Sequence, residues 1–146
     1  MSHTGHDYAR EAASYEGVRY KTYGRSRQTG LDCFGLVLAP AWGLGIDLPD
    51  FRDYDPRCPD PSVVLSRCRE HLLEVPFEDA GAGCIAVSQW DNQLAGARHL
   101  SVLLPGERMV HVDAIRRRVT RVPAGWLEGK LRGVFRIPAL EYGGSW

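Results

Sequence analysis

The spacing of apolar residues changes once along the chain, at Gly83. Before this glycine, apolar residues recur at helical spacing, as Tyr8, Ala12 and Tyr15 do. After it, apolar and polar residues alternate, which is the period of a half-buried strand. Helices followed by a run of strands are typical of an α+β fold. Because 146 residues suffice for one hydrophobic core, we expect a single domain over 1–146.

The first half of the chain predicts helices separated by irregular segments. A polar loop over Val18–Leu31 leads into an apolar stretch that Asp32 opens as a helix cap. Gly43–Pro59 predicts an irregular acidic loop, because its aspartates lack the ligand spacing of a calcium-binding loop. The predicted helices are Asp7–Glu16, Asp32–Gly43 and Asp60–Glu74.

The second half predicts strands joined by short turns. Pro105-Gly106-Glu107 is a turn signal between two of them, and Pro123–Lys130 predicts a short helix. Consecutive strands of this kind form an antiparallel meander. The predicted strands are Ile85–Val87, His99–Leu104, Arg108–Asp113, Arg116–Val122 and Leu131–Ile137.

The charge balance argues against partners that are bound by net charge alone. Lys plus Arg and Asp plus Glu both number 18, so the formal net charge is zero and no overall field favours nucleic acid or a membrane surface. No apolar run approaches the roughly 20 residues that span a bilayer. The N-terminal residues lack the apolar core of a Sec signal peptide, so we expect another route of delivery if the substrate lies outside the cytoplasm.

The cysteine pattern indicates neither a disulfide scaffold nor a zinc site. The four cysteines, Cys33, Cys58, Cys68 and Cys84, form no CxxC pair. Cys68 and His71 lie three residues apart on a predicted helix, but two ligands do not make a metal site. We therefore expect no metal, and we interpret Cys58, Cys68 and Cys84 as buried or incidental thiols.

Cys33 is the thiol best placed to act as a nucleophile. Attack requires the thiolate, and a helix N-terminus or a neighbouring imidazolium lowers the pKa of a thiol. Cys33 stands at the predicted start of the apolar helix, where backbone N–H groups and the helix dipole favour negative charge. Gly35, two residues further on, would let the backbone approach a substrate closely.

A histidine would supply the base, and the chain contains five. We expect His3 and His6 to lie in a frayed N-terminus and His71 to be a surface residue. His99 and His111 flank the predicted hairpin and come nearly opposite each other when it folds. On the side of the strand that faces the nucleophile helix, one imidazole would contact the thiol while the other holds its second nitrogen. Spacing alone leaves open that these are two unrelated strand histidines.

Three segments of the chain carry a family resemblance. They are Gly17-Val-Arg-Tyr20, Gly30-Leu-Asp-Cys33-Phe-Gly-Leu-Val37, and the stretch from His99 to His111. In this order and at these distances they resemble the nucleophile region and the histidine hairpin of the NlpC/P60 family. The resemblance implies a papain-like α+β fold in which the nucleophile helix packs on an antiparallel sheet.

The same resemblance implies a cysteine peptidase with a triad of Cys33, His99 and His111. Such enzymes hydrolyse peptide bonds in peptidoglycan stem peptides, commonly between D-glutamate and the following diamino acid. Tyr20 would line the active site and help hold the substrate or the oxyanion, and the Cys33 N–H would form part of the oxyanion hole. The resemblance implies no cofactor or metal.

Two positions depart from the family pattern. Arg19 stands in place of a proline, and Phe34 in place of the serine after the nucleophile. Relatives use the aspartate and the serine beside the cysteine to recognise the free amine of a stem peptide. Asp32 and Phe34 are therefore candidate substrate-binding residues together with Tyr20, and the bond that is cut stays open. Phe34 would either narrow the cleft or pack in the core.

Other features resemble the compact branch of this family that is encoded with phage tails and gene transfer agents. They are Gly24-Arg-Ser26, the helix Asp60–Glu74 and the segment Gly133–Ile137. This branch implies a component of a virion tail that opens the cell wall, with other tail or baseplate proteins as partners. The alternatives are a tail-tip protein that keeps the fold without activity, and an amidase or acyltransferase on the same scaffold.

Two groups of basic residues lie near the predicted site. We expect Arg19, Lys21, Arg25 and Arg27 to flank the cleft entrance, where they would meet stem carboxylates. For the run Arg116-Arg117-Arg118, a solvated face is the default interpretation.

Overall fold

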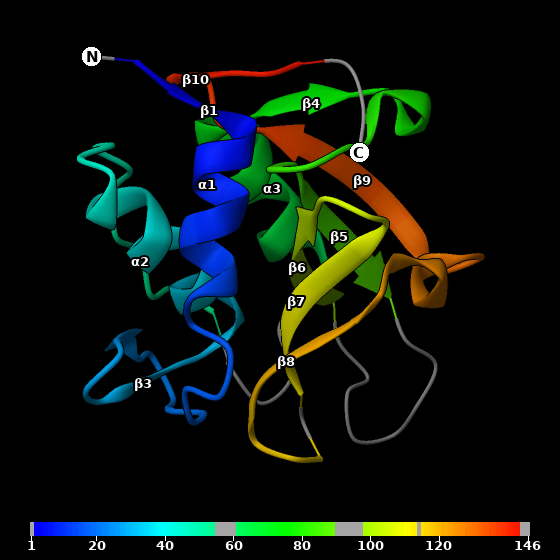
Figure 1. The fold of residues 1–146 in the computed structure, drawn as a ribbon. Coiled ribbons are helices and arrows are strands. Elements are labelled where there is room, and N and C mark those ends of the chain that lie inside the picture. The colour runs from blue at the N-terminus through cyan, green and yellow to red at the C-terminus, as the bar shows by residue number, and fades with distance from the viewer. Residues whose placement is uncertain (1, 55–60, 90–97, 114, 144–146) are drawn as a thin grey trace.

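The computed structural model describes residues 2–54, 61–89, 98–113 and 115–143 (Figure 1). Its helices are α1 (Gly5–Ala13), α2 (Cys33–Gly43), α3 (Pro61–His71) and the short 3-10 helices η1 (Phe77–Asp79) and η2 (Ala124–Leu127). Its strands are β1 (His3–Thr4), β2 (Arg25–Ser26), β3 (Gly30–Leu31), β4 (Leu73–Val75), β5 (Ile85–Gln89), β6 (Arg98–Leu104), β7 (Arg108–Asp113), β8 (Arg118–Pro123), β9 (Leu131–Arg136) and β10 (Leu140–Glu141).

Six strands form one antiparallel sheet in the order β4-β9-β5-β6-β7-β8. β5 to β8 follow each other as the predicted meander. β9 does not extend this meander beyond β8, because it returns to pair with β5 on one side and β4 on the other. Val134 and Phe135 of β9 are both fully buried, one in the core on each face, as suits a strand inside the sheet. The predicted α+β class is confirmed.

The two faces of the sheet have different cover. Leu100 and Val102 of β6 pack in the main core with residues of α1 and α2. Leu103, which alternates with them, packs on the opposite face with Met109 of β7 and Leu127 of η2. Figure 1 shows α1 and α2 lying together on one side of the sheet. The sheet therefore separates a large helical core from a smaller cluster beneath η2.

The start of the chain is better ordered than its sequence predicts. The helix predicted from Asp7 begins at Gly5, because Thr4 and Asp7 form a reciprocal capping box. β1 pairs with β10, so the fraying expected for the segment that holds His3 is wrong. The two first helices are tied together by the hydroxyl of buried Tyr8, which donates to the Val37 carbonyl at 2.7 Å.

The helix predicted over Asp60–Glu74 is wrong at its C-terminal end. α3 ends at His71, and the chain then enters β4, where Leu73 and Val75 pair with β9. β4 covers an edge of β9 that would otherwise be open. This strand pairing outweighs the helical pattern of the segment. Cys58 and the predicted cap Asp60 lie outside the described residues.

The loop predicted over Val18–Leu31 is confirmed, and it contains only the two-residue strands β2 and β3, which form a small hairpin. The next helix begins at Cys33 with Asp32 as its N-cap, as predicted. None of the described helices combines the length and the apolar character that a membrane span requires.

Candidate active site

His99 on β6 and His111 on β7 are in direct contact. Ser101 is the residue opposite His111 in the register, so His99 lies diagonally across from His111. The Nε2 atom of His99 and the Nδ1 atom of His111 are 2.8 Å apart, and the two rings are nearly perpendicular, at 86°. The juxtaposition that the hairpin spacing predicts is present in the structure.

Burial lowers the pKa of both imidazoles. At His99 the proximity of His111 adds to the effect of burial, and the pKa falls to about 3. At His111 burial outweighs the opposing attraction of Asp113, and the pKa is lowered as well. Both rings are therefore neutral at pH 7. Because Nε2 of His99 bonds His111, its Nδ1 is the nitrogen left to accept a proton.

The histidine pair does not lie on the face of the sheet that we expected. Ser101 and Leu103 alternate in phase with His99, and Leu103 packs beneath η2, whereas Leu100 packs against the helices. The prediction that the His99 side of the strand faces the nucleophile helix is therefore wrong. The reason is that both sides of β6 carry apolar residues. The ring of His111 instead meets Trp126 of η2 edge-on, with centroids 6.4 Å apart.

Cys33 is the first residue of α2 and is partly exposed. The cap residue Asp32 accepts a hydrogen bond from the Gly35 N–H at 2.8 Å. α2 packs against β6 and β7, which places the nucleophile helix against the histidine hairpin. Within the described residues, no hydrogen bond joins the Cys33 thiol to either imidazole, whereas the two imidazoles bond each other.

The prediction that the helix N-terminus lowers the pKa of Cys33 is wrong. The residue is partly exposed, but the atoms around its sulfur desolvate the thiolate. This burial, reinforced by the charge of Asp32, raises the pKa of Cys33 to about 12. The Phe34 N–H and the Arg25 guanidinium oppose the shift without cancelling it. The resting pair is therefore a thiol and a neutral imidazole.

Asp32 has no carboxylate oxygen free for a substrate amine. One oxygen accepts hydrogen bonds from Arg25 and the Gly35 N–H, and the other accepts from the Tyr23 N–H and the Tyr54 hydroxyl. The Asp32 and Arg25 side chains are 2% and 8% exposed and form an ion pair at 2.8 Å. The structure thus gives this carboxylate a structural role, and the substrate contact of Asp32 stays a prediction.

Arg25 is a structural residue that its sequence context does not reveal. Each of its N–H groups has an acceptor: beside Asp32 these are the Asp50 carboxylate, the Tyr54 hydroxyl and two backbone carbonyls, Gly24 and Phe51. The guanidinium thus ties β2 and the cap of α2 to the segment 50–54. The prediction that Arg25 meets stem carboxylates is wrong for this reason.

Phe34 and Gly35 are both closely packed against other parts of the protein. Phe34 is buried and packs against Phe51 and Tyr54, with ring centroids 4.8 and 4.6 Å away. Phe34 therefore packs in the core, which was one of the two alternatives, and its role in substrate binding stays a prediction. A Cβ atom on Gly35 would lie 2.0 Å from the Gly24 carbonyl oxygen, so the close approach expected here is made to the protein's own backbone.

Tyr20 lies where the loop before α2 meets β8. Its N–H donates to the Arg117 carbonyl at 2.8 Å, and it bridges to Leu31, two residues before the nucleophile. The Arg117 guanidinium lies over its ring at 4.8 Å, and its hydroxyl is 3.3 Å from that of Thr22. Tyr20 is partly buried, and it remains a candidate substrate-binding residue.

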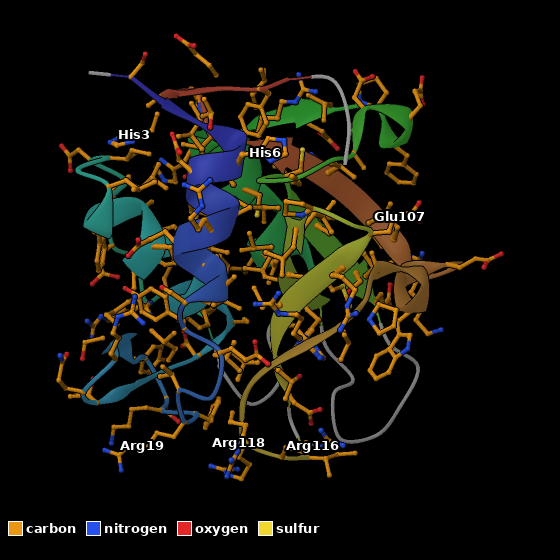
Figure 2. All side chains as sticks on the ribbon, in the orientation of Figure 1. His3, His6, Arg19, Glu107, Arg116 and Arg118 are labelled. Atoms are coloured by element: carbon orange, nitrogen blue, oxygen red, sulfur yellow. The ribbon has the colours of Figure 1, made fainter. Side chains whose placement is uncertain are left out.

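Exposed basic residues gather along one edge of the molecule, which we call the basic edge. Arg19 and Arg118 form an isolated bridge, and Figure 2 shows both with Arg116 along the lower edge of the view. Arg27 does not belong to it, because it bonds Ser14 and pairs with Glu11. In the described part of the chain, no salt bridge involves a member of the basic edge: Arg19, Lys21, Arg116, Arg117 and Arg118.

The other thiols and histidines of the described residues have surroundings of their own. Cys68 and Cys84 are buried. His71 stacks on Phe51, with centroids 5.7 Å apart. His3 and His6 lie near the start of α1, far from the lower edge in Figure 2. Among residues 2–54, 61–89, 98–113 and 115–143, no three His, Cys, Asp or Glu side chains form a group able to hold a metal ion.

The fold of this chain is similar to that of solved NlpC/P60 structures. A Staphylococcus aureus protein described as similar to a lipoprotein of the NLP/P60 family aligns at 23% identity and a TM-score of 0.64, over 91% of this chain and 41% of its own. The NlpC/p60 domain of the peptidoglycan hydrolase SagA aligns at 18% identity and a TM-score of 0.65, over 92% of this chain and 99% of its own. The Mycobacterium tuberculosis peptidoglycan hydrolase RipB aligns at 24% identity and a TM-score of 0.62, over 91% of this chain and 64% of its own.

The chain therefore has the NlpC/P60 fold, as predicted. No family model matches its sequence, and no curated protein matches it either. At these sequence identities, the similarity shows a shared fold. The chain spans less than half the length of the Staphylococcus aureus protein and about two thirds of RipB.

Proposed function

We propose that this protein is a cysteine endopeptidase that hydrolyses peptide bonds in peptidoglycan stem peptides. The observation that carries the proposal is the 2.8 Å contact between His99 Nε2 and His111 Nδ1, on the hairpin against which the Cys33 helix packs. The peptidoglycan hydrolases SagA and RipB, which have this fold, support the class of substrate.

The proposed chemistry uses His99 as the base. The Cys33 thiol would meet this ring at the start of β6, because further along the strand the face that carries His99 packs away from α2. The Nδ1 atom of His99 takes the proton of the Cys33 thiol as the sulfur attacks the substrate carbonyl, since a free thiolate is unfavourable at this site. His111 holds the ring through Nε2. The Cys33 N–H, which has no acceptor within its helix, would stabilise the oxyanion. The leaving amine takes the proton from His99, and water then hydrolyses the thioester.

The favoured bond in this proposal lies between D-glutamate and the diamino acid of the stem. The resemblance around Cys33 and His99 supports this choice. Because Asp32 and Phe34 serve the protein's own packing, we place substrate contacts on Tyr20 and on the basic edge. Arg19 and Lys21 would bind the carboxylates of the stem.

We also propose that the protein acts as a component of a virion tail or tail-like particle. The support is the sequence resemblance of Gly24-Arg-Ser26 and Gly133–Ile137 to the tail-associated branch. Mass spectrometry of purified particles would detect the protein in tails if this is right. Its absence from particles made by cells that express it would contradict this placement.

Digestion of purified sacculi tests the enzymatic proposal. Wild type should release fragments with a new amine at the diamino acid, identified by mass, and Cys33→Ala and His99→Gln should release none. Release of whole stem peptides from the glycan would instead indicate an amidase. Transfer of a stem to an added amine without hydrolysis would indicate an acyltransferase. No release by folded wild-type protein would favour a structural role.

A further inference from the structure

Three polar side chains form a row across the sheet beneath η2. Ser101 on β6, His111 on β7 and Thr120 on β8 are direct partners in the strand register, so their side chains share one face. All three residues are buried, with 0%, 7% and 8% of their surface exposed. The middle member of this row is the histidine that bonds His99.

Each member of the row carries a buried polar atom that no described residue bonds: Ser101 Oγ, His111 Nε2 and Thr120 Oγ1. A buried polar group without a partner is costly, and native proteins commonly satisfy such groups with internal water. Three such atoms on neighbouring strands are enough to hold water, which needs two to four polar partners.

The proton positions of the proposed mechanism show what this row has to supply. For His99 to accept a proton at Nδ1, its neutral ring must carry hydrogen on Nε2 and donate it to His111 Nδ1. His111 is then an acceptor at Nδ1, and in its neutral form it carries its own hydrogen on Nε2. This Nε2–H group is the one for which the described residues offer no acceptor.

We propose that Ser101, His111 and Thr120 bind buried water, and that this water accepts the Nε2 proton of His111. The water donates in turn to the Ser101 or the Thr120 hydroxyl, both of which can accept. It thereby holds both imidazoles in the tautomers that leave Nδ1 of His99 free. Ser101 and Thr120 are positioning residues. The catalytic consequence rests on the proposed function, but the water site and the tautomers are properties of the resting protein.

Nitrogen-15 spectra of the histidine rings test the site without any substrate. Wild type should show hydrogen on Nε2 of both His99 and His111. The Ser101→Ala/Thr120→Val variant should show a second tautomer for both rings, and Thr29→Val, which removes an exposed hydroxyl, should match wild type. Ser101→Ala alone gives the same test with a smaller change if the double variant does not fold. Unchanged tautomers in the folded variants would overturn the proposal.

A high-resolution crystal structure supplies the second test. Water within hydrogen-bond distance of His111 Nε2 is expected in wild type and should be lost or displaced in the double variant. A hydroxyl bonded directly to Nε2, with no water there, would overturn the proposal. In the enzyme assay the double variant should lower kcat about tenfold with KM unchanged. Because the spectra are read without turnover, failure of hydrolysis and failure of this site are distinguishable.

Discussion

Arg25 and Asp32 form a buried ion pair at 2.8 Å immediately before the nucleophile, with side-chain exposures of 8% and 2%. Asp32 also caps α2, so the pair fixes the turn from which Cys33 projects. Tyr54 bonds both partners and closes the network from a distant part of the chain. The position of Cys33 therefore depends on side chains from distant parts of the chain.

Removing one partner of this pair should destabilise the protein strongly. Arg25→Met leaves the Asp32 charge buried and without its counter-ion, which costs about 3–5 kcal/mol of unfolding free energy. Urea unfolding measures the change. Arg67→Met serves as the control, because Arg67 pairs with Asp53 and Glu70 at the surface and should cost less than about 1 kcal/mol. Equal losses in the two variants would contradict the structural role of Arg25.

Adding a methyl group at Gly35 should also destabilise the protein. The new Cβ would meet the Gly24 carbonyl oxygen at 2.0 Å. Because this oxygen belongs to the backbone, the helix must shift, at a cost of about 1–3 kcal/mol. Gly125→Ala is the matched control, because a Cβ there meets nothing within 4 Å. Thermal unfolding of the two variants measures the difference. Similar melting temperatures would mean that Gly35 is not in close contact.

The histidine pair should make the fold sensitive to acid. The pKa of His99 and of His111 is lowered in the folded state, so the unfolded chain binds more protons as pH falls below 6.5. Their contribution to stability is therefore present above pH 6.5 and is lost progressively toward pH 3. Urea midpoints from pH 8 to pH 4 measure this loss. His99→Gln/His111→Gln should show a flatter dependence, and an equal slope would contradict burial of the pair.

The Cys33 thiol should react slowly with iodoacetamide near neutral pH. Because its pKa is raised to about 12, the alkylation rate should rise about tenfold per pH unit between pH 7 and pH 10. Peptide mapping identifies the modified cysteine, and Cys33→Ser supplies the background. A rate that levels off below pH 8 would instead show a thiolate–imidazolium pair.

The basic edge should contribute to binding and not to chemistry. Neutralising Arg19, Lys21 and Arg118 to glutamine should raise the KM for anionic wall fragments about five- to tenfold at low salt, with kcat unchanged. Arg27→Gln is the control, because this arginine pairs with Glu11. If the triple variant keeps the wild-type KM, stem carboxylates do not bind at this edge.

Local patterns predicted the parts of the site that short-range interactions determine. The cap at Asp32 and the contact of His99 with His111 follow from a helix start and a short hairpin. The face on which His99 lies was not predictable, because Leu100 and Leu103 make both sides of β6 apolar.

Interactions between distant segments left no local signal. Tyr54 lies 22 residues from Asp32, and nothing in the spacing shows that its hydroxyl fills that carboxylate. The pairing of β4 with β9 likewise joins two distant residues, Val75 and Val134. Because of this pairing, α3 ends earlier than the sequence predicts. The raised pKa of Cys33 could not be predicted for a related reason. The helix N-terminus can be read from sequence, but the desolvation that outweighs it depends on the packed fold.

The central claim is that Cys33 attacks a stem peptide with His99 as its base, and trapping the thioester tests it most directly. Wild type mixed with a stem peptide and quenched in acid should carry one acyl group, mapped by mass to the peptide that contains Cys33. His99→Gln should form this adduct at least about a hundredfold more slowly. Formation of the same cleavage products by Cys33→Ala would contradict the claim.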